Sequence, residues 1–184
     1  MMHQFLLAGF GGQGVMLMGR ILAYAGMKEQ KQVMYIPSYG SEMRGGTANC
    51  SVILSEEEID APVVSKPSGL VVMNAPSFDK FETRIRENGL VIVNSSTVTR
   101  EALRQDVKVI KVPANDMAKE LGNERIANMI LLGTLISATK CLKAESVLES
   151  LKEILPVHRH DLLPLNQKAI EAGMQLAIST PKRN

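Results

Sequence analysis

The chain has 184 residues, of which 45% are hydrophobic, 22% are charged and 4% are aromatic, and its formal net charge is +2. This balance is ordinary for a soluble globular protein, and the small net charge with few aromatic side chains argues against nucleic acid or a membrane as a partner. No apolar run is long enough to span a bilayer and the N-terminus lacks a secretion signal, so we expect a cytoplasmic protein.

The N-terminal segment predicts a strand, a glycine turn and a helix in that order. Phe5–Ala8 is a short apolar run, and Val15–Ala25 carries apolar residues at helical spacing. Between them, Gly9, Gly11 and Gly14 have the G-x-G-x-x-G spacing, which lets backbone N–H groups approach an anion at the helix N-terminus. The candidate cofactor-binding residues of this turn, with a phosphate group as the expected ligand, are Gly9, Gly11, Gly12, Gln13 and Gly14.

The second predicted strand, Val33–Ile36, lacks one element of a dinucleotide-binding site. That site also needs an acidic residue at the end of the second strand, where its carboxylate holds a ribose hydroxyl. Here the strand ends in Pro37-Ser38-Tyr39, and Glu42 comes later, inside a polar loop. Two interpretations therefore stay open: the glycines bind a phosphate, or they only let the first helix pack tightly on the sheet.

The loop at 38–46 contains no helix pattern, and a further strand is expected at 47–54. A parallel crossover needs a dozen or more residues and usually a helix, which this loop is too short to hold. We therefore expect the 47–54 strand to run antiparallel to its predecessor, which gives a mixed sheet.

The rest of the chain alternates strand and helix patterns and then becomes helical. The remaining predicted strands are 69–73, 90–93 and 107–110, and the remaining predicted helices are 77–88, 116–121, 127–142, 144–155 and 158–178, the last interrupted near Pro164. We expect a three-layer α/β/α fold with a mixed, mostly parallel Rossmann-like sheet and a helical C-terminal third. Because no linker marks a boundary, residues 1–184 should form a single domain.

The loop after the second strand has a composition that favours contact with a ligand or a partner. Arg44 is a candidate for bidentate pairing with a carboxylate or phosphate, and it joins the cofactor-binding candidates. Tyr, Met and Arg together are typical of interface hot spots, so the loop is also a candidate subunit interface. That interface would comprise Tyr39, Ser41, Glu42, Met43, Arg44, Gly45 and Gly46. A solvated connector is the alternative that composition leaves open.

Residue types with metal or redox chemistry do not form a site in the sequence. Cys50 and Cys141 are too few for a disulfide framework or a cluster of four thiolates, and we expect both to be buried. Any iron–sulfur cluster therefore belongs to another polypeptide. His158 and His160 point in different directions on a helix and have no third ligand, so we expect no metal site. No nucleophile and base stand out as a pair, so we expect no catalytic residue in this chain.

Two motifs together carry a family resemblance. Gly11-Gly12-Gln13-Gly14 follows the N-terminal strand, and 39–50 reads Y-G-S-E-M-R-G-G-T-A-N-C at the matching distance. With both motifs, the chain resembles the gamma subunit of 2-oxoacid:ferredoxin (or acceptor) oxidoreductases over nearly its entire length. The segment 41–50 resembles most the 2-oxoglutarate, KorC-like branch, and less the pyruvate or indolepyruvate branches.

The resemblance implies a role within a larger complex. The family's reaction is the oxidative decarboxylation of a 2-oxoacid with coenzyme A to an acyl-CoA (succinyl-CoA from 2-oxoglutarate), carbon dioxide and a reduced acceptor such as ferredoxin. The resemblance implies thiamine diphosphate on a beta subunit closed by an alpha subunit, iron–sulfur clusters on partner chains, and a ferredoxin-like delta subunit as a further partner. The isolated chain is then expected to be inactive, and coenzyme A is the ligand that the glycine turn and Arg44 would suit.

Two rival interpretations of the glycine turn come from other classes of protein. The first is a stand-alone dinucleotide-binding oxidoreductase, which the missing acidic residue after the second strand disfavours. The second is a nucleotide-sensing module that has no catalytic partner.

Overall fold

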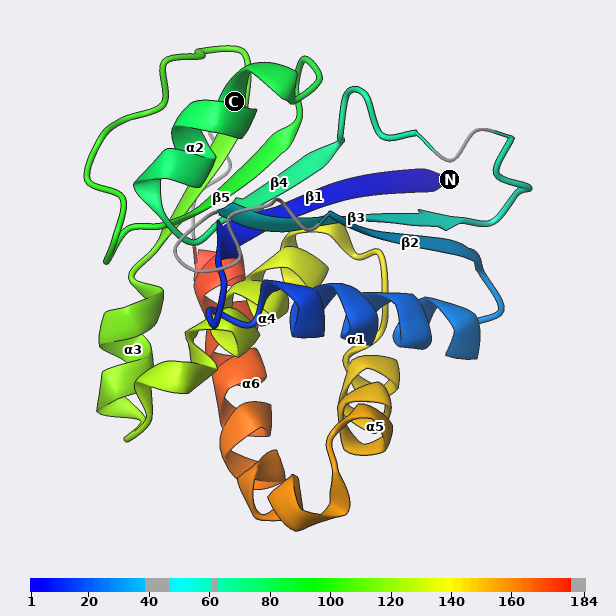
Figure 1. The fold of residues 1–184 in the computed structure, drawn as a ribbon, viewed down its shortest axis with the longest axis vertical. Coiled ribbons are helices and arrows are strands. Elements are labelled where there is room, and N and C mark those ends of the chain that lie inside the picture. The colour runs from blue at the N-terminus through cyan, green and yellow to red at the C-terminus, as the bar shows by residue number, and fades with distance from the viewer. Residues whose placement is uncertain (39–46, 61–62, 180–184) are drawn as a thin grey trace.

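The computed structural model describes residues 1–38, 47–60 and 63–179, and it contains a six-stranded sheet in the order β2-β3-β1-β4-β5-β6 (Figure 1). The strands are β1 (Met2–Phe10), β2 (Gln32–Ser38), β3 (Thr47–Ser55), β4 (Gly69–Val72), β5 (Leu90–Asn94) and β6 (Lys108–Val112). β3 pairs antiparallel with both of its neighbours, and β1, β4, β5 and β6 pair parallel in that order. The predicted mixed, mostly parallel sheet is therefore confirmed, including the antiparallel strand after the short loop.

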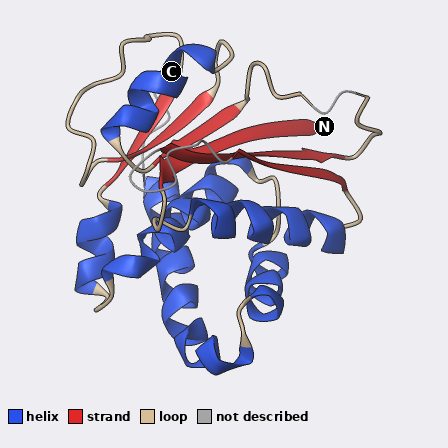
Figure 2. Ribbon diagram, viewed as in Figure 1, coloured by secondary structure: helices blue, strands red, loops and turns tan. Residues whose placement is uncertain are grey.

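Helices cover both faces of the sheet, with most of them on one side (Figure 2). The larger layer contains α1 (Val15–Lys28), α3 (Ala114–Glu120), α4 (Ala127–Thr139), α5 (Ala144–Ile154) and α6 (Leu163–Ser179), and the other face carries α2 (Ala75–Phe81). Short 3-10 segments are η1 (Glu82–Arg84), η2 (Glu124–Ile126) and η3 (Val157–Leu162). Within the described residues, no helix combines the length and the apolar character that a bilayer span requires.

The central strand β1 contains a continuous apolar run at residues 5–8. Successive side chains of a strand point to opposite faces. Phe5 and Leu7 belong to the core cluster under α1 and α4, whereas Leu6 and Ala8 belong to a second cluster with Phe78 of α2. Residues 5–8 are buried on both faces, so this part of the strand has no polar positions, whereas the polar His3 and Gln4 lie near its partly exposed start.

Two predicted helices differ from the structure in their bounds. The 77–88 helix is shorter and earlier: α2 begins after Asn74, whose side chain accepts a hydrogen bond from the Ser77 N–H, and η1 ends where Ile85 is extended. The predicted interruption near Pro164 is confirmed, because the 3-10 segment η3 ends at Leu162 and the α-helix α6 begins at Leu163. Pro164 falls in the first turn of α6, where its missing N–H removes no intrahelical hydrogen bond.

The helices α4 and α6 cross at very close range. A Cβ atom on Gly133 would lie 2.0 Å from the carbonyl oxygen of Ile170, and one on Gly173 would lie 1.9 Å from the carbonyl oxygen of Ile130. The Thr134 hydroxyl donates a hydrogen bond of 3.1 Å to the Gly173 carbonyl. Two glycines therefore let the helix backbones touch, and this contact sets the position of α4 beneath the sheet.

Candidate functional site

The glycine turn lies between β1 and α1. Some of its glycines are required by a left-handed backbone and others by close packing. Gly12 and Gly14 have left-handed backbones, with φ of 90° and 79°. A Cβ on Gly14 would also lie 2.2 Å from Nδ2 of the Asn128 side chain, and one on Gly9 would lie 2.7 Å from Oε1 of Gln13. Gly11 and Gly12 are exposed. The turn thus needs glycine for conformation and for packing, and its outer side is open to solvent.

The Gln13 side chain points into the protein and connects the glycine turn to the end of β4 through hydrogen bonds. Its Oε1 accepts hydrogen bonds from the Phe10 N–H at 2.6 Å and from Nδ2 of Asn74 at 3.0 Å. Its Nε2 donates to the Met73 carbonyl at 3.4 Å. The Gln13 amide is therefore engaged with groups of the protein at the ends of β1 and β4.

This bridge occupies the place where open α/β sheets usually bind nucleotides. The chain leaves β1 toward β2 on one side and later returns to β4 on the other, so the crevice between the ends of β1 and β4 is the topological switch point. The Gln13–Asn74 contact spans that crevice. Together with the missing acidic residue after β2, it argues against a dinucleotide lying across the sheet edge.

The outer side of the turn has the donors that an anion requires. The first N–H groups of a helix have no intrahelical acceptor, and α1 starts at Val15 with no side-chain cap and no acidic residue in its first turn. The Gly14 carbonyl accepts a hydrogen bond of 3.2 Å from the buried Asn128 side chain of α4, which fixes the last residue of the turn. Chemically, this arrangement can bind a phosphate group through backbone donors.

The described residues on either side of the second loop, Ser38 at the end of β2 and Thr47 at the start of β3, lie at the same end of the sheet. The candidate residues of this loop, Tyr39, Ser41, Glu42, Met43, Arg44, Gly45 and Gly46, lie outside the described residues. The described neighbours Ser38 and Thr47 flank them, and Thr47 pairs with Phe10, the last residue before Gly11. The fold therefore brings the attachment point of this loop beside the glycine turn, although the two motifs are far apart in the sequence.

The cysteines have a packing role, and the Cys50 thiol lies 3.6 Å from the Val15 carbonyl oxygen at the start of α1. Cys50 and Cys141 are both free and buried, as expected. The described residues contain no group of three or more His, Cys, Asp or Glu side chains that could hold a metal ion. His160 lies in η3, where its Nε2 is 2.9 Å from the Leu155 carbonyl oxygen.

We expect both thiols to resist alkylation in the folded protein. Burial raises the pKa of Cys50 to about 12 and that of Cys141 to about 11. At about pH 8 the thiolate fraction of Cys50 is then on the order of one part in ten thousand, and the thiolate is the reactive form. Mass spectrometry after iodoacetamide treatment should find no label until urea unfolds the chain. Rapid labelling of the native protein would contradict this expectation.

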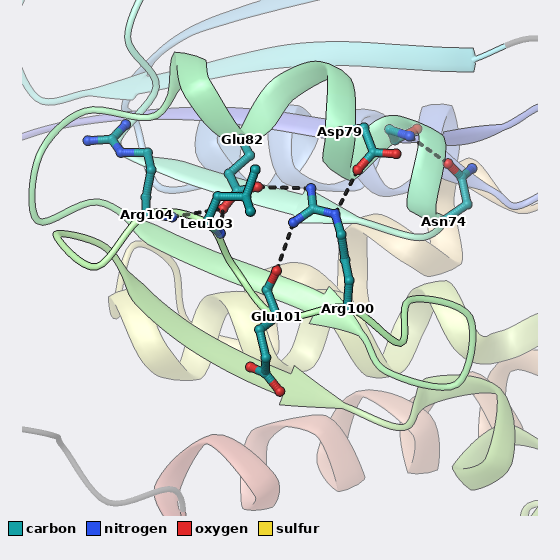
Figure 3. Close-up of polar contacts among 8 residues, drawn as sticks. Asn74, Asp79, Glu82, Arg100, Glu101, Leu103 and Arg104 are labelled. Atoms are coloured by element: carbon teal, nitrogen blue, oxygen red, sulfur yellow. Dashed lines mark hydrogen bonds and ion pairs between the residues drawn. The ribbon is translucent and has the colours of Figure 1, made fainter.

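Sequence reasoning missed a partly buried charge cluster on the opposite face of the sheet (Figure 3). The Arg100 guanidinium lies 2.7 Å from Asp79 of α2 and 2.8 Å from Glu82 of η1, and it stacks 3.9 Å from the centre of the Phe78 ring. Glu82 is 1% exposed and also accepts hydrogen bonds from the backbone N–H groups of Leu103 and Arg104. We call this the Arg100 cluster, and it fastens the segment after β5 onto α2.

Comparison with known proteins decides the family. Residues 4–176 match the family described as pyruvate ferredoxin/flavodoxin oxidoreductase. The chain belongs to this family. Ketoisovalerate oxidoreductase subunit VorA of Methanothermobacter marburgensis is 37% identical over 172 residues, which are 93% of this chain and 36% of VorA. The 2-oxoglutarate synthase subunit KorC of Methanocaldococcus jannaschii is 35% identical over 159 residues, which are 85% of each chain. The chain thus spans about a third of VorA but most of KorC.

Solved structures of this family share the fold. The gamma subunit of a keto/oxoacid ferredoxin oxidoreductase from Geobacter sulfurreducens superposes with a TM-score of 0.84 at 27% identity, covering 97% of this chain and 99% of that one. A 2-oxoglutarate:ferredoxin oxidoreductase from Magnetococcus marinus, solved with 2-oxoglutarate, coenzyme A and succinyl-CoA, superposes with a TM-score of 0.91 at 20% identity. That match covers the whole of this chain and 32% of the other. The fold of this chain is therefore that of the gamma subunits of this family.

Proposed function

We propose that this chain is the gamma subunit of a multi-subunit 2-oxoacid:ferredoxin oxidoreductase that uses 2-oxoglutarate. The similarity to KorC, at 35% identity over 85% of both chains, carries the proposal because it matches a subunit of the same extent. The assembled complex would oxidatively decarboxylate 2-oxoglutarate with coenzyme A to succinyl-CoA, carbon dioxide and reduced ferredoxin. Residues 1–184 would serve as one gamma-type domain, since a single sheet carries all the described helices.

A second candidate substrate is ketoisovalerate. VorA, at 37% identity, favours it on similarity, although this chain spans only 36% of that protein. The two candidates assign the same role to this chain, because we propose that substrate selection belongs to the partner subunits. Comparing the two oxoacids as substrates of the assembled complex decides between them.

Within the complex, this chain would bind a phosphate of coenzyme A at the outer side of the glycine turn. Three observations support this: exposed Gly11 and Gly12, an α1 N-terminus without a side-chain cap, and no acidic residue in its first turn. Gly9, Gly14 and Gln13 would hold the turn in shape, and Arg44 would add a positive charge from the loop that ends at Thr47. Coenzyme A supplies the thiol that receives the acyl group, and we propose that thiamine diphosphate and iron–sulfur clusters are held by alpha, beta and delta-type partners.

Purification from the native cell tests the role of the chain. We expect it to elute with larger subunits that carry thiamine diphosphate and iron–sulfur absorbance, and the complex should reduce ferredoxin only when 2-oxoacid and coenzyme A are both present. Recovery of a lone chain that reduces a nicotinamide cofactor would overturn the proposal and favour the stand-alone oxidoreductase.

Gln13→Glu tests the phosphate site in the assembled complex. Glutamate keeps an acceptor for the Phe10 N–H and Asn74, but it places a negative charge beside the turn. We expect KM for coenzyme A to rise roughly tenfold to a hundredfold, because like charges in contact cost a few kcal/mol, while KM for the oxoacid stays unchanged.

Thr97→Val is the matched control for this variant. The Thr97 hydroxyl donates to the Met73 carbonyl at 2.7 Å, the same acceptor that Gln13 uses, so its removal disturbs the same strand end without adding charge. We expect KM for coenzyme A to stay near the wild-type value. Equal KM values for Gln13→Glu and wild type would show that coenzyme A does not contact this turn.

A further inference from the structure

The two faces of the sheet are covered to different extents. One face lies under α1, α4 and the other helices of the larger layer. On the other face, α2 contacts β1 and β4, and the second core cluster extends from β1 to β5 (Figure 2). Figure 2 shows no further described helix over β2 and β3 on that side. Part of the sheet therefore lacks a helical layer within the described residues.

The strand pattern identifies the side chains on this uncovered part. Val33 and Tyr35 of β2 pack against the cluster under α1, so the alternate residues Met34 and Ile36 point to the opposite side. The same alternation and the pairing register place residues of β3 and β1 beside them. We call this surface the open face, and its partly buried residues are Phe10, Met34, Ile36, Thr47, Asn49 and Ser51. By the same register, this side also carries the fully buried Ile53 and the exposed Gln32 and Ser38.

The open face has the chemistry of a covered surface. None of the residues on this side of β1, β2 and β3 is charged, in a chain in which 22% of residues are charged, and most of them are partly or fully buried. Met34, Ile36 and Phe10 belong to neither of the core clusters that the described residues form. An outward face of an antiparallel pair that meets water normally carries polar and charged side chains, whereas interface cores are depleted of charge.

A comparison of KorC with VorA indicates what covers the open face. In KorC, a match of this extent accounts for 85% of the subunit, whereas in VorA it accounts for 36% of a longer polypeptide. The same domain thus occurs as a separate subunit and as part of a larger chain. A contact that lies within one polypeptide in VorA must be a contact between subunits where the domain is separate.

We propose that the open face is the docking surface for the larger subunit that corresponds to the rest of VorA. This inference rests on the proposed function, since it assumes that the chain works in a complex. The partner should offer an uncharged, largely apolar surface to Met34, Ile36 and Phe10. Because Phe10 directly precedes the exposed Gly11, docking places the partner beside the glycine turn, so a coenzyme A molecule held there by its phosphate could extend its thiol toward the partner.

Charge substitutions on the open face test the proposal in the complete complex. We expect Met34→Glu and Ile36→Glu to weaken assembly at least about thirtyfold, because each would bury an unpaired carboxylate at the interface. The control is Met27→Glu on α1, where the side chain is 63% exposed on the opposite side of the sheet, and it should assemble like wild type. Light scattering of the complex and the melting temperature of each variant chain are the measurements.

The outcomes separate this inference from the proposed function. If the wild-type chain forms no complex, the proposed function fails. If the wild-type chain assembles and both open-face variants assemble equally well, or if Met27→Glu alone disrupts assembly, the docking surface is elsewhere. Hydrogen exchange on the wild type is independent of any variant's folding: assembly should slow exchange in β2 and β3 and leave α5 unchanged. The reverse pattern would overturn the inference.

Discussion

Gly173→Ala is expected to destabilise the protein by about 3 kcal/mol or more. The new Cβ would lie 1.9 Å from the carbonyl oxygen of Ile130 and 2.9 Å from the backbone nitrogen of Thr134. Both are backbone atoms of α4, so no side chain can move aside and the two helices must separate. Separation also breaks the hydrogen bond from the Thr134 hydroxyl to the Gly173 carbonyl. Urea unfolding followed by circular dichroism measures the loss.

Gly122→Ala is the control that separates a steric clash from backbone strain. Gly122 has a φ of +93°, yet a Cβ there would have no neighbour within 4 Å. We expect it to cost about 1 kcal/mol, the price of a left-handed backbone without glycine. If Gly173→Ala unfolds at the same urea concentration as Gly122→Ala, the close helix contact does not limit stability.

The helix contact also matters for the glycine turn. Asn128 lies at the start of α4 and donates the hydrogen bond that holds the Gly14 carbonyl. A shift of α4 away from α6 would move this donor. We therefore expect Gly133→Ala, which brings a Cβ within 2.0 Å of the Ile170 carbonyl oxygen, to disturb the turn as well as the core.

The mixed character of the sheet could be predicted, although its strand order was not, because the direction of β3 depends on the length of one loop. The loop at 38–46 is too short for a parallel crossover, and that alone gives the antiparallel β3 that the structure shows. The glycine spacing likewise predicts a turn at a helix start, and Gly12 and Gly14 have the left-handed backbones that such a turn needs. The length of the loop and the spacing of the glycines are local features, so both predictions could be made without knowing which distant residues are in contact.

Contacts between distant residues could not be predicted in the same way. Gly133 and Gly173 meet because α4 and α6 cross, and no periodicity in either helix marks the crossing point. The spacing also groups Gln13 with the ligand-binding candidates, whereas the structure shows its amide bonded to Phe10, Met73 and Asn74. A glycine motif predicts backbone conformation, but the direction of a side chain inside the turn depends on the neighbouring strand.

The Arg100 cluster likewise could not be predicted from the sequence, because it joins distant residues. Asp79 and Glu82 are three residues apart, and Arg100 follows them only after β5. In the sequence these are ordinary surface charges. In the structure, Glu82 is 1% exposed, and its pairing depends on how the segment after β5 folds back over α2.

Glu82→Leu is expected to cost about 1–3 kcal/mol of folding free energy, because two backbone N–H groups lose their acceptor and Arg100, whose side chain is 28% exposed, loses one of its two counter-charges. Arg100 would keep only the exposed Asp79, whose distance is 2.7 Å, and the N–H groups of Leu103 and Arg104 would lose their acceptor. Arg100→Met should be destabilising for the reciprocal reason, since it leaves the Glu82 carboxylate buried. Chemical unfolding of both variants measures these costs.

The double variant Glu82→Leu with Arg100→Met distinguishes a charge effect from a loss of packing. Replacing a buried ion pair by apolar side chains removes the cost of an unpaired charge, so the double variant should be more stable than the sum of the single variants predicts. Some loss should remain, because Leu103 and Arg104 still lack the acceptor that Glu82 provided. Strict additivity would mean that Glu82 and Arg100 stabilise α2 independently, and that the ion pair at 2.8 Å contributes nothing of its own.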